Sequence, residues 1–251
     1  LYIFFKIINL DKDLPLFFYS LIKFDSLFVD WTLRFDLLVS VLIILVTFIG
    51  LFLIIYSKGI SKNHSINFKT NSYISLSIFG VLVLISSNNL IQFFLGWYLI
   101  ILSSYLISNM SKNKIDNSNI FFQNRVSDLC FFLSLYFVYT FSNSINFDII
   151  FKNFQIVEHN INFFNKTFSS VDIISFILFF SFLLRCRQFY ISNSRYDLLN
   201  FNTSLYSIIL YGLYIPIGLY FILRFFTLTQ TSLDYLNLLL LLGSCFTFIF
   251  S

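Results

Sequence analysis

Apolar residues occur in this chain as long runs rather than in strict alternation. A helix needs about 20 apolar residues to cross the hydrocarbon core of a bilayer. Seven runs approach that length, at residues 36–56, 72–87, 90–109, 126–141, 171–184, 204–222 and 235–251. The pattern predicts an all-α fold, a polytopic transmembrane helix bundle of about seven spans. Residues 15–29 are also apolar, but Lys23 and Asp25 interrupt them, so we expect this segment at the membrane interface or packed against protein.

Composition supports a membrane protein. Of the 251 residues, 58% are hydrophobic and 11% charged, and the mean hydropathy is +0.83. A soluble domain carries about 25% charged residues, so the lipid bilayer must be the solvent here. Phe occurs 37 times and Ala is absent. Small residues are favoured where membrane helices touch, so a mutational bias of an AT-rich, organelle-type genome explains this usage better than packing does.

Charge is distributed unevenly between the predicted loops. The loops after the first, third and fifth spans are basic, with Lys58, Lys62, Lys69, Lys112, Lys114, Arg125, Arg185, Arg187 and Arg195 against Asp116 and Asp197. The loops on the opposite face are close to neutral. The positive-inside rule therefore places the basic loops in the matrix or cytoplasm and the N-terminus outside. We divide the chain into an N-terminal interfacial or outside segment, 1–35, and one transmembrane helix domain, 36–251.

Cofactor and metal chemistry has no candidate residues. The three Cys and two His are scattered, and they form neither a metal-ligand spacing nor a disulfide framework. The chain has no Gly-rich phosphate loop and no nucleophile elbow. We therefore expect no metal, no bound cofactor and no catalytic residue on this chain. Its expected surroundings are membrane lipids, and no nucleic-acid partner is expected.

Ionisable residues near the spans are the functional candidates, because a charge inside a membrane is expensive. Asp128 follows Arg125 by one helical turn, so the two can pair, either in a proton path or as a structural ion pair. Arg185 and Arg187 end the fifth span, where they are either cations reaching the interface or part of a discontinuous helix. Asp36 and Asp172 open helices, and we interpret them as capping residues.

Several short motifs carry a resemblance to a known family. They are Gly96-Trp97-Tyr98 followed by Ser104-Tyr105-Leu106, Asn124-Arg125-Val126-Ser127-Asp128, and Leu184-Arg185-Cys186-Arg187-Gln188 with a gapless run through Asp197 to Arg224. In their order and spacing they resemble the antiporter-like subunit 5 family of mitochondrial NADH dehydrogenase, respiratory complex I. That family has G-W-E, N-R-V-G-D and G-K-S-A-Q at these places.

The resemblance implies a proton path that runs near mid-membrane through a Glu, a Lys at a helix break and a His. Here the Glu position is Tyr98, the Lys position is Arg185 and the His position is Leu210. A relay group must gain and lose a proton near working pH, which Leu and Arg do not do and Tyr does poorly. The resemblance thus gives proton-path or charge-pair candidates, Arg185, Asp128, Arg125, Arg187, Asp197 and Tyr98, in a degenerate first half-channel.

The resemblance also implies a role and a location. The chain would be a non-redox membrane-arm subunit of complex I in the mitochondrial inner membrane, with its N-terminal segment facing the intermembrane space. FMN, iron–sulfur clusters and ubiquinone would lie on partner subunits. Because the family protein is longer, we expect a split gene, with a second chain supplying the missing helices, or a reduced form. The alternatives are a stand-alone multisubunit cation/proton antiporter subunit and a non-conducting structural subunit of complex I.

Overall fold

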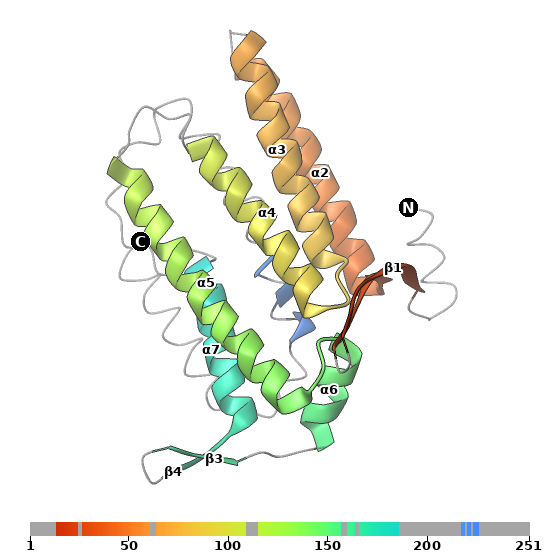
Figure 1. Ribbon diagram of the computed structural model, residues 1–251. Helices are drawn as coiled ribbons and strands as arrows, with labels where there is room; N and C mark the ends of the chain where they lie inside the picture. Colours follow the sequence, from red (N-terminus) through yellow and green to blue (C-terminus); the bar gives the residue numbers. More distant parts are fainter. Residues whose placement is uncertain are drawn as a thin grey trace.

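The structure is a bundle of long helices that run back and forth. It is a computed structural model that describes residues 14–24, 27–60, 64–108, 115–156, 160–163, 166–185, 217, 218, 220, 221 and 223–225. The long helices are α2 (Leu37–Ile60), α3 (His64–Ile85), α4 (Leu90–Ser108), α5 (Ile115–Ser142) and α7 (Ser170–Arg185), and Figure 1 shows them side by side. The predicted helical membrane bundle is confirmed.

The first five predicted spans correspond to these helices. Within the described residues, three helical segments are long and apolar enough to cross a membrane, Leu37–Gly59, Phe68–Ile85 and Leu90–Ile107. The fourth and fifth predicted spans lie in α5 and α7, and α5 already begins at Ile115, in a stretch expected to be a loop. The seventh span and most of the sixth lie outside the described residues. The count of seven and the helix break beyond Arg185 therefore stay predictions.

Two β-hairpins and one short helix were not expected from the sequence. Strands β1 (Leu14–Phe24) and β2 (Leu27–Phe35) pair antiparallel, as do β3 (Asn160–Phe163) and β4 (Lys166–Ser169). Helix α6 (Phe147–Ile156) follows α5. The run Leu16-Phe17-Phe18-Tyr19 is apolar without alternation, and the β1–β2 register shifts nearby, so no period-2 signal was available. Both hairpins and α6 lie at the end of the bundle where α2 begins (Figure 1).

Helices α3 and α4 approach each other closely through glycine. A Cβ at Gly96 would come within 2.7 Å of the Leu84 backbone Cα, and one at Gly80 within 3.2 Å of the Ile100 backbone nitrogen. Close backbone approach through small residues is the usual way for membrane helices to pack, because lipid gives no hydrophobic drive for association. Gly96, the first residue of the Gly-Trp motif, therefore sets the distance between α3 and α4.

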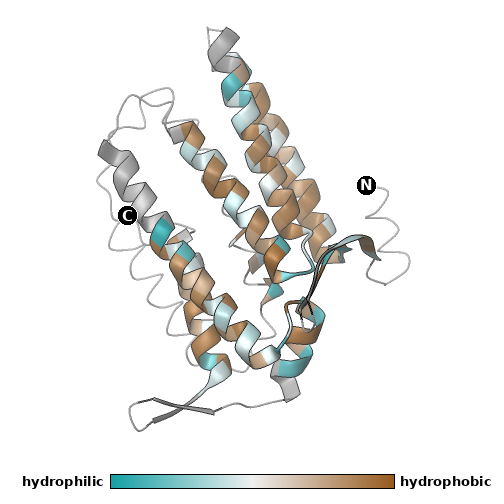
Figure 2. Ribbon diagram, in the orientation of Figure 1, coloured by the Kyte–Doolittle hydropathy of each residue, from teal (hydrophilic) through white to brown (hydrophobic). Residues whose placement is uncertain are grey.

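An aromatic cluster fills the interior between α4, α5, α6 and the 217–225 segment. We call Phe93, Trp97, Phe131, Phe147, Phe221 and Phe225 the aromatic cluster; all six are buried. Ring centroids lie 4.6 Å apart for Phe93 and Phe221 and 5.1 Å apart for Trp97 and Phe131. In Figure 2 hydrophobic positions dominate the middle of α2, α3 and α4, and hydrophilic positions gather towards helix ends and turns.

We expect Gly96→Ala to destabilise the bundle by about 1–3 kcal/mol, because the added methyl group meets backbone that must move. The matched control is Gly59→Ala near the end of α2, where a Cβ would meet nothing within 4 Å. The measurement is the thermal unfolding midpoint of the solubilised protein together with the amount of chain that accumulates in the membrane. Equal behaviour of the two variants would refute the close approach at Gly96.

Candidate functional site

The first candidate site centres on Asp128, in the interior of α5. The Trp97 indole N–H donates a hydrogen bond to Asp128 Oδ1 at 3.1 Å. Arg125 Nη1 lies 3.7 Å from Asp128 Oδ2, and the side chains of Asp128 and Arg125 are 9% and 41% exposed. The structure thus confirms that Arg125 and Asp128 lie close enough to pair. The indole N–H and the nearby guanidinium partly compensate this carboxylate for its loss of contact with water.

Trp97 is the member of this site that the sequence did not assign. Its ring packs in the aromatic cluster, and its N–H on α4 donates a hydrogen bond to Asp128 on α5. One residue therefore joins the two helices by packing and by a polar contact. Ser127 makes a second crossing contact, because its hydroxyl donates to the Ser181 carbonyl of α7 at 2.9 Å. The available signal was Trp97 itself, since a buried indole N–H needs an acceptor.

Of the other predicted site residues, Tyr98 is the one whose side chain the structure describes. Tyr98 lies on α4 with its side chain 46% exposed, and its ring is 6.4 Å from that of Phe94. Arg185 is the last residue of α7, and its side chain lies outside the described residues. Arg187, Asp197 and Leu210 also lie outside them. Of the six candidates, the structure brings together Arg125 and Asp128.

The second candidate site lies where three chain segments meet at one end of the bundle. We call the place where residues 30–36, 86–90 and 144–148 meet, together with Arg224 of the 217–225 segment, the junction. Backbone N–H groups of Arg34, Leu90 and Phe147 donate to carbonyls of Ser86 (2.9 Å), Ile145 (3.1 Å) and Asn88 (3.1 Å) respectively. The Asn89 side chain donates to the Asp30 carbonyl at 2.5 Å. The turn at Asn88 and Asn89 thus holds the hairpin and the α5–α6 turn together.

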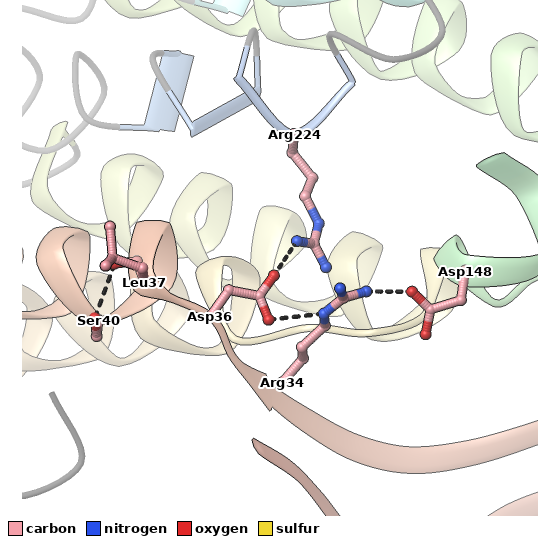
Figure 3. A network of polar contacts seen from close by, with 6 residues as sticks. All are labelled: Arg34, Asp36, Leu37, Ser40, Asp148 and Arg224. Carbon is pink, nitrogen blue, oxygen red and sulfur yellow. Dashed lines mark hydrogen bonds and ion pairs between the residues drawn. The ribbon is translucent and has the colours of Figure 1, made fainter. Parts of the chain in front are cut away.

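Four charged side chains lie at the junction, and we call them the four-charge cluster. Asp36 accepts Arg34 Nε on Oδ1 at 2.7 Å and Arg224 Nη1 on Oδ2 at 2.5 Å, and Arg34 also contacts Asp148 (Figure 3). The side chains of Asp36 and Arg224 are 14% and 9% exposed. Two cations and two anions neutralise each other here, which lowers the cost of keeping them out of water.

The capping predictions are partly corrected. Asp36 does precede α2, and its carbonyl accepts the Ser40 N–H, but its carboxylate is occupied by the two arginines. Asp172 lies in the first turn of α7, and its own N–H donates to the Ser169 hydroxyl at 3.1 Å. Ser169 is therefore the capping side chain of α7. A local pattern identified both helix starts, but it could not reveal a partner 188 residues away.

The described part of the chain offers no metal centre. It contains no group of three or more His, Cys, Asp or Glu side chains that could hold an ion. The acidic residues found together, Asp36 and Asp148, are already matched by arginines.

Residues 87–251 match the family model described as NADH:quinone oxidoreductase/Mrp antiporter, TM. The chain belongs to this family. This chain is 25% identical to NADH-ubiquinone oxidoreductase chain 5 of Chondrus crispus, over 98% of this chain and 38% of that protein. NADH-quinone oxidoreductase subunit L of Rickettsia typhi is 33% identical over 62% of this chain and 24% of that protein. The chain thus spans well under half the length of these relatives. Both candidate sites include residues of the matched antiporter region.

We expect Asp36→Asn to destabilise the folded chain by about 3 kcal/mol, because Arg224 would keep a largely buried charge without its carboxylate. Asp148→Asn is the matched control: this side chain is 53% exposed, so losing its contact with Arg34 should cost at most about 1 kcal/mol. The thermal midpoint of the solubilised protein measures both. A larger loss for Asp148→Asn than for Asp36→Asn would contradict this ranking.

Proposed function

We propose that this chain is a membrane-arm subunit of respiratory complex I, which contributes to proton translocation coupled to NADH:ubiquinone oxidoreduction. The observation that carries the proposal is the family match over residues 87–251, together with relatives named as chain 5 and subunit L of NADH:quinone oxidoreductases. The chain itself would perform no redox chemistry. FMN, iron–sulfur clusters and ubiquinone would lie on partner subunits.

The Asp128 site supports a role in handling charge inside the membrane. Asp128 is buried in α5, with Trp97 as a donor and Arg125 nearby. Such an intramembrane carboxylate is costly and is kept where it pairs or lies on an ion pathway. We propose that this pair sets the electrostatic potential at mid-bundle, with Arg125 compensating the charge of Asp128.

We further propose that the first half-channel of this chain is degenerate as a proton relay. The resemblance places Tyr98 where the family has Glu and Arg185 where it has Lys. Arg stays protonated in proteins, and Tyr has an ordinary pKa near 10, so neither exchanges protons readily at neutral pH. The half-exposed position of Tyr98 on α4 agrees with this, because Asp128 is buried and its described contacts are with Trp97 and Arg125.

The proposed location is the mitochondrial inner membrane. The junction would then face the intermembrane space, and the basic ends of α2 and α5 would face the matrix, as the positive-inside rule requires. The proposed neighbours are other subunits of the membrane arm and membrane lipids. The remaining helices of such a subunit would be found in the same assembly, whether or not a separate gene encodes them.

Assembly is tested by a native gel of solubilised mitochondrial membranes, stained for NADH oxidation. We expect peptides of this chain in the stained band, because a membrane-arm subunit migrates with the NADH-oxidising complex. As an internal control, an unrelated inner-membrane protein should be absent from that band. If the peptides migrate in a separate complex without NADH oxidation, the stand-alone cation/proton antiporter takes the place of this proposal.

The test of proton transfer is the proton conductance of the reconstituted complex. Each value is divided by the amount of assembled complex. We expect Arg185→Lys to leave conductance unchanged or to raise it, because a Lys can release a proton and an Arg cannot. We expect Asp128→Asn to reduce assembly, because it disrupts the charge pair with Arg125. A large loss of normalised conductance in Arg185→Lys would show that Arg185 is active and that the half-channel is not degenerate.

A further inference from the structure

Buried polar atoms without hydrogen-bond partners are concentrated at the junction. They include the side-chain carbonyl oxygens of Asn88, Asn89 and Asn146, and Nε and Nη2 of Arg224. Each of these atoms is shielded from bulk water within the described part of the chain. Native proteins pair more than about 90% of such groups, so a set of them in one place requires a common explanation.

The hydroxyl of Tyr220 and the amide of Gln92 extend this set. Tyr220 is completely buried and lies beside Ser87. The charges of Arg224 and Asp36 both act on its hydroxyl. Its hydroxyl makes no hydrogen bond of ordinary geometry. Gln92 is 1% exposed, neither of its amide atoms is paired, and it lies one helical turn along α4 from Asn88 and Asn89.

The chemistry of the set indicates which kind of ligand would fit it. Arg224 supplies donors, the asparagines supply acceptors, and they do not bond one another directly, so the bridging molecule must both donate and accept. An anion would need surplus positive charge, but Asp36 and Asp148 neutralise the two arginines. A cation would be repelled by the unpaired face of Arg224. Water is the ligand that fits, and a buried water makes about three such bonds.

We propose that the junction is a buried hydration site, in which ordered water molecules link Arg224 and Tyr220 to the asparagines of the 86–89 turn and to Asn146. The waters complete the hydrogen bonding of Arg224, of which Nη1 alone is bonded to Asp36 among the described residues. Water bridges of this kind are almost as favourable as direct hydrogen bonds. The site is distinct from the proposed proton relay and does not depend on it.

The aromatic cluster limits this site on its inner side. Phe147 and Phe225 lie 5.6 Å apart, Phe221 and Phe225 lie 5.1 Å apart, and Arg224 lies over the Phe147 ring at 5.6 Å. These rings offer water no hydrogen-bond partner, and they separate the junction from the Trp97–Asp128 contact. The hydration site therefore exchanges with the aqueous phase at the junction end, near the half-exposed Asp148.

The direct test is a cryo-EM map of the assembled complex at a resolution that shows ordered water. We expect density peaks within about 3.2 Å of Arg224 Nε or Nη2 and of at least one asparagine side-chain oxygen. Density for a lipid phosphate at Arg224, direct side-chain pairing of these atoms, or the absence of peaks beside well-defined side chains would each overturn the proposal.

An independent test uses hydroxyl radicals produced from water by X-rays, with oxidation located by mass spectrometry. Tyr220 and Phe131 are both completely buried, but only Tyr220 would lie beside water. With each rate divided by that of the same residue in unfolded chain, we expect Tyr220 to be oxidised several-fold faster than Phe131 in the assembled complex. Asn146→Leu should remove much of that difference by displacing a bridging water. Equal rates in the unmodified complex would refute the site, and this comparison needs no variant to fold.

Discussion

The carboxylate of Asp36 is the contact on which the arrangement of this end of the bundle depends. It immediately precedes α2, and its two oxygens bind Arg34 of the hairpin and Arg224 of the 217–225 segment. The hairpin and the start of α2 are thereby fixed to the 217–225 segment, whose Arg224 is 188 residues away along the chain. The backbone bonds at the 86–89 turn add α3, α4 and the α5–α6 turn to the same point. Without a neutralised centre, so many polar groups could not lie at the edge of an apolar bundle.

A chain without Ala still needs small residues where its helices touch. Serine provides many of them here: Ser77, Ser103, Ser104, Ser134 and Ser181 are buried, and each hydroxyl donates to a carbonyl one turn earlier in its own helix. The hydroxyl is thereby satisfied within the helix, so a polar residue can stand at a membrane-helix contact. Phenylalanine fills the remaining volume. The biased composition is thus accommodated by local hydrogen bonds and by aromatic packing.

Sequence patterns predicted what depends on nearby residues and failed where the partner is distant. Apolar runs located α2, α3, α4, α5 and α7, and the spacing of Arg125 and Asp128 gave their pairing. The Asp36–Arg224 pair could not be found, because nothing local marks a partner 188 residues away. The hairpin β1–β2 has no alternation to reveal it. Helix α6 was detectable in principle, since Phe147, Ile150 and Phe151 recur at helical spacing.

The two polar sites lie at different depths, and the aromatic cluster between them decides how each communicates with water. Asp128 is fourteen residues before the end of α5, or about 21 Å along the helix from the junction end. The rings of Phe93, Phe131 and Phe221 occupy the space between α4, α5 and the 217–225 segment and carry no group that could pass a proton. Such a layer disfavours a chain of hydrogen bonds, because its rings offer water no partner. Within the described residues, the charge pair and the four-charge cluster are therefore separate electrostatic centres in one bundle.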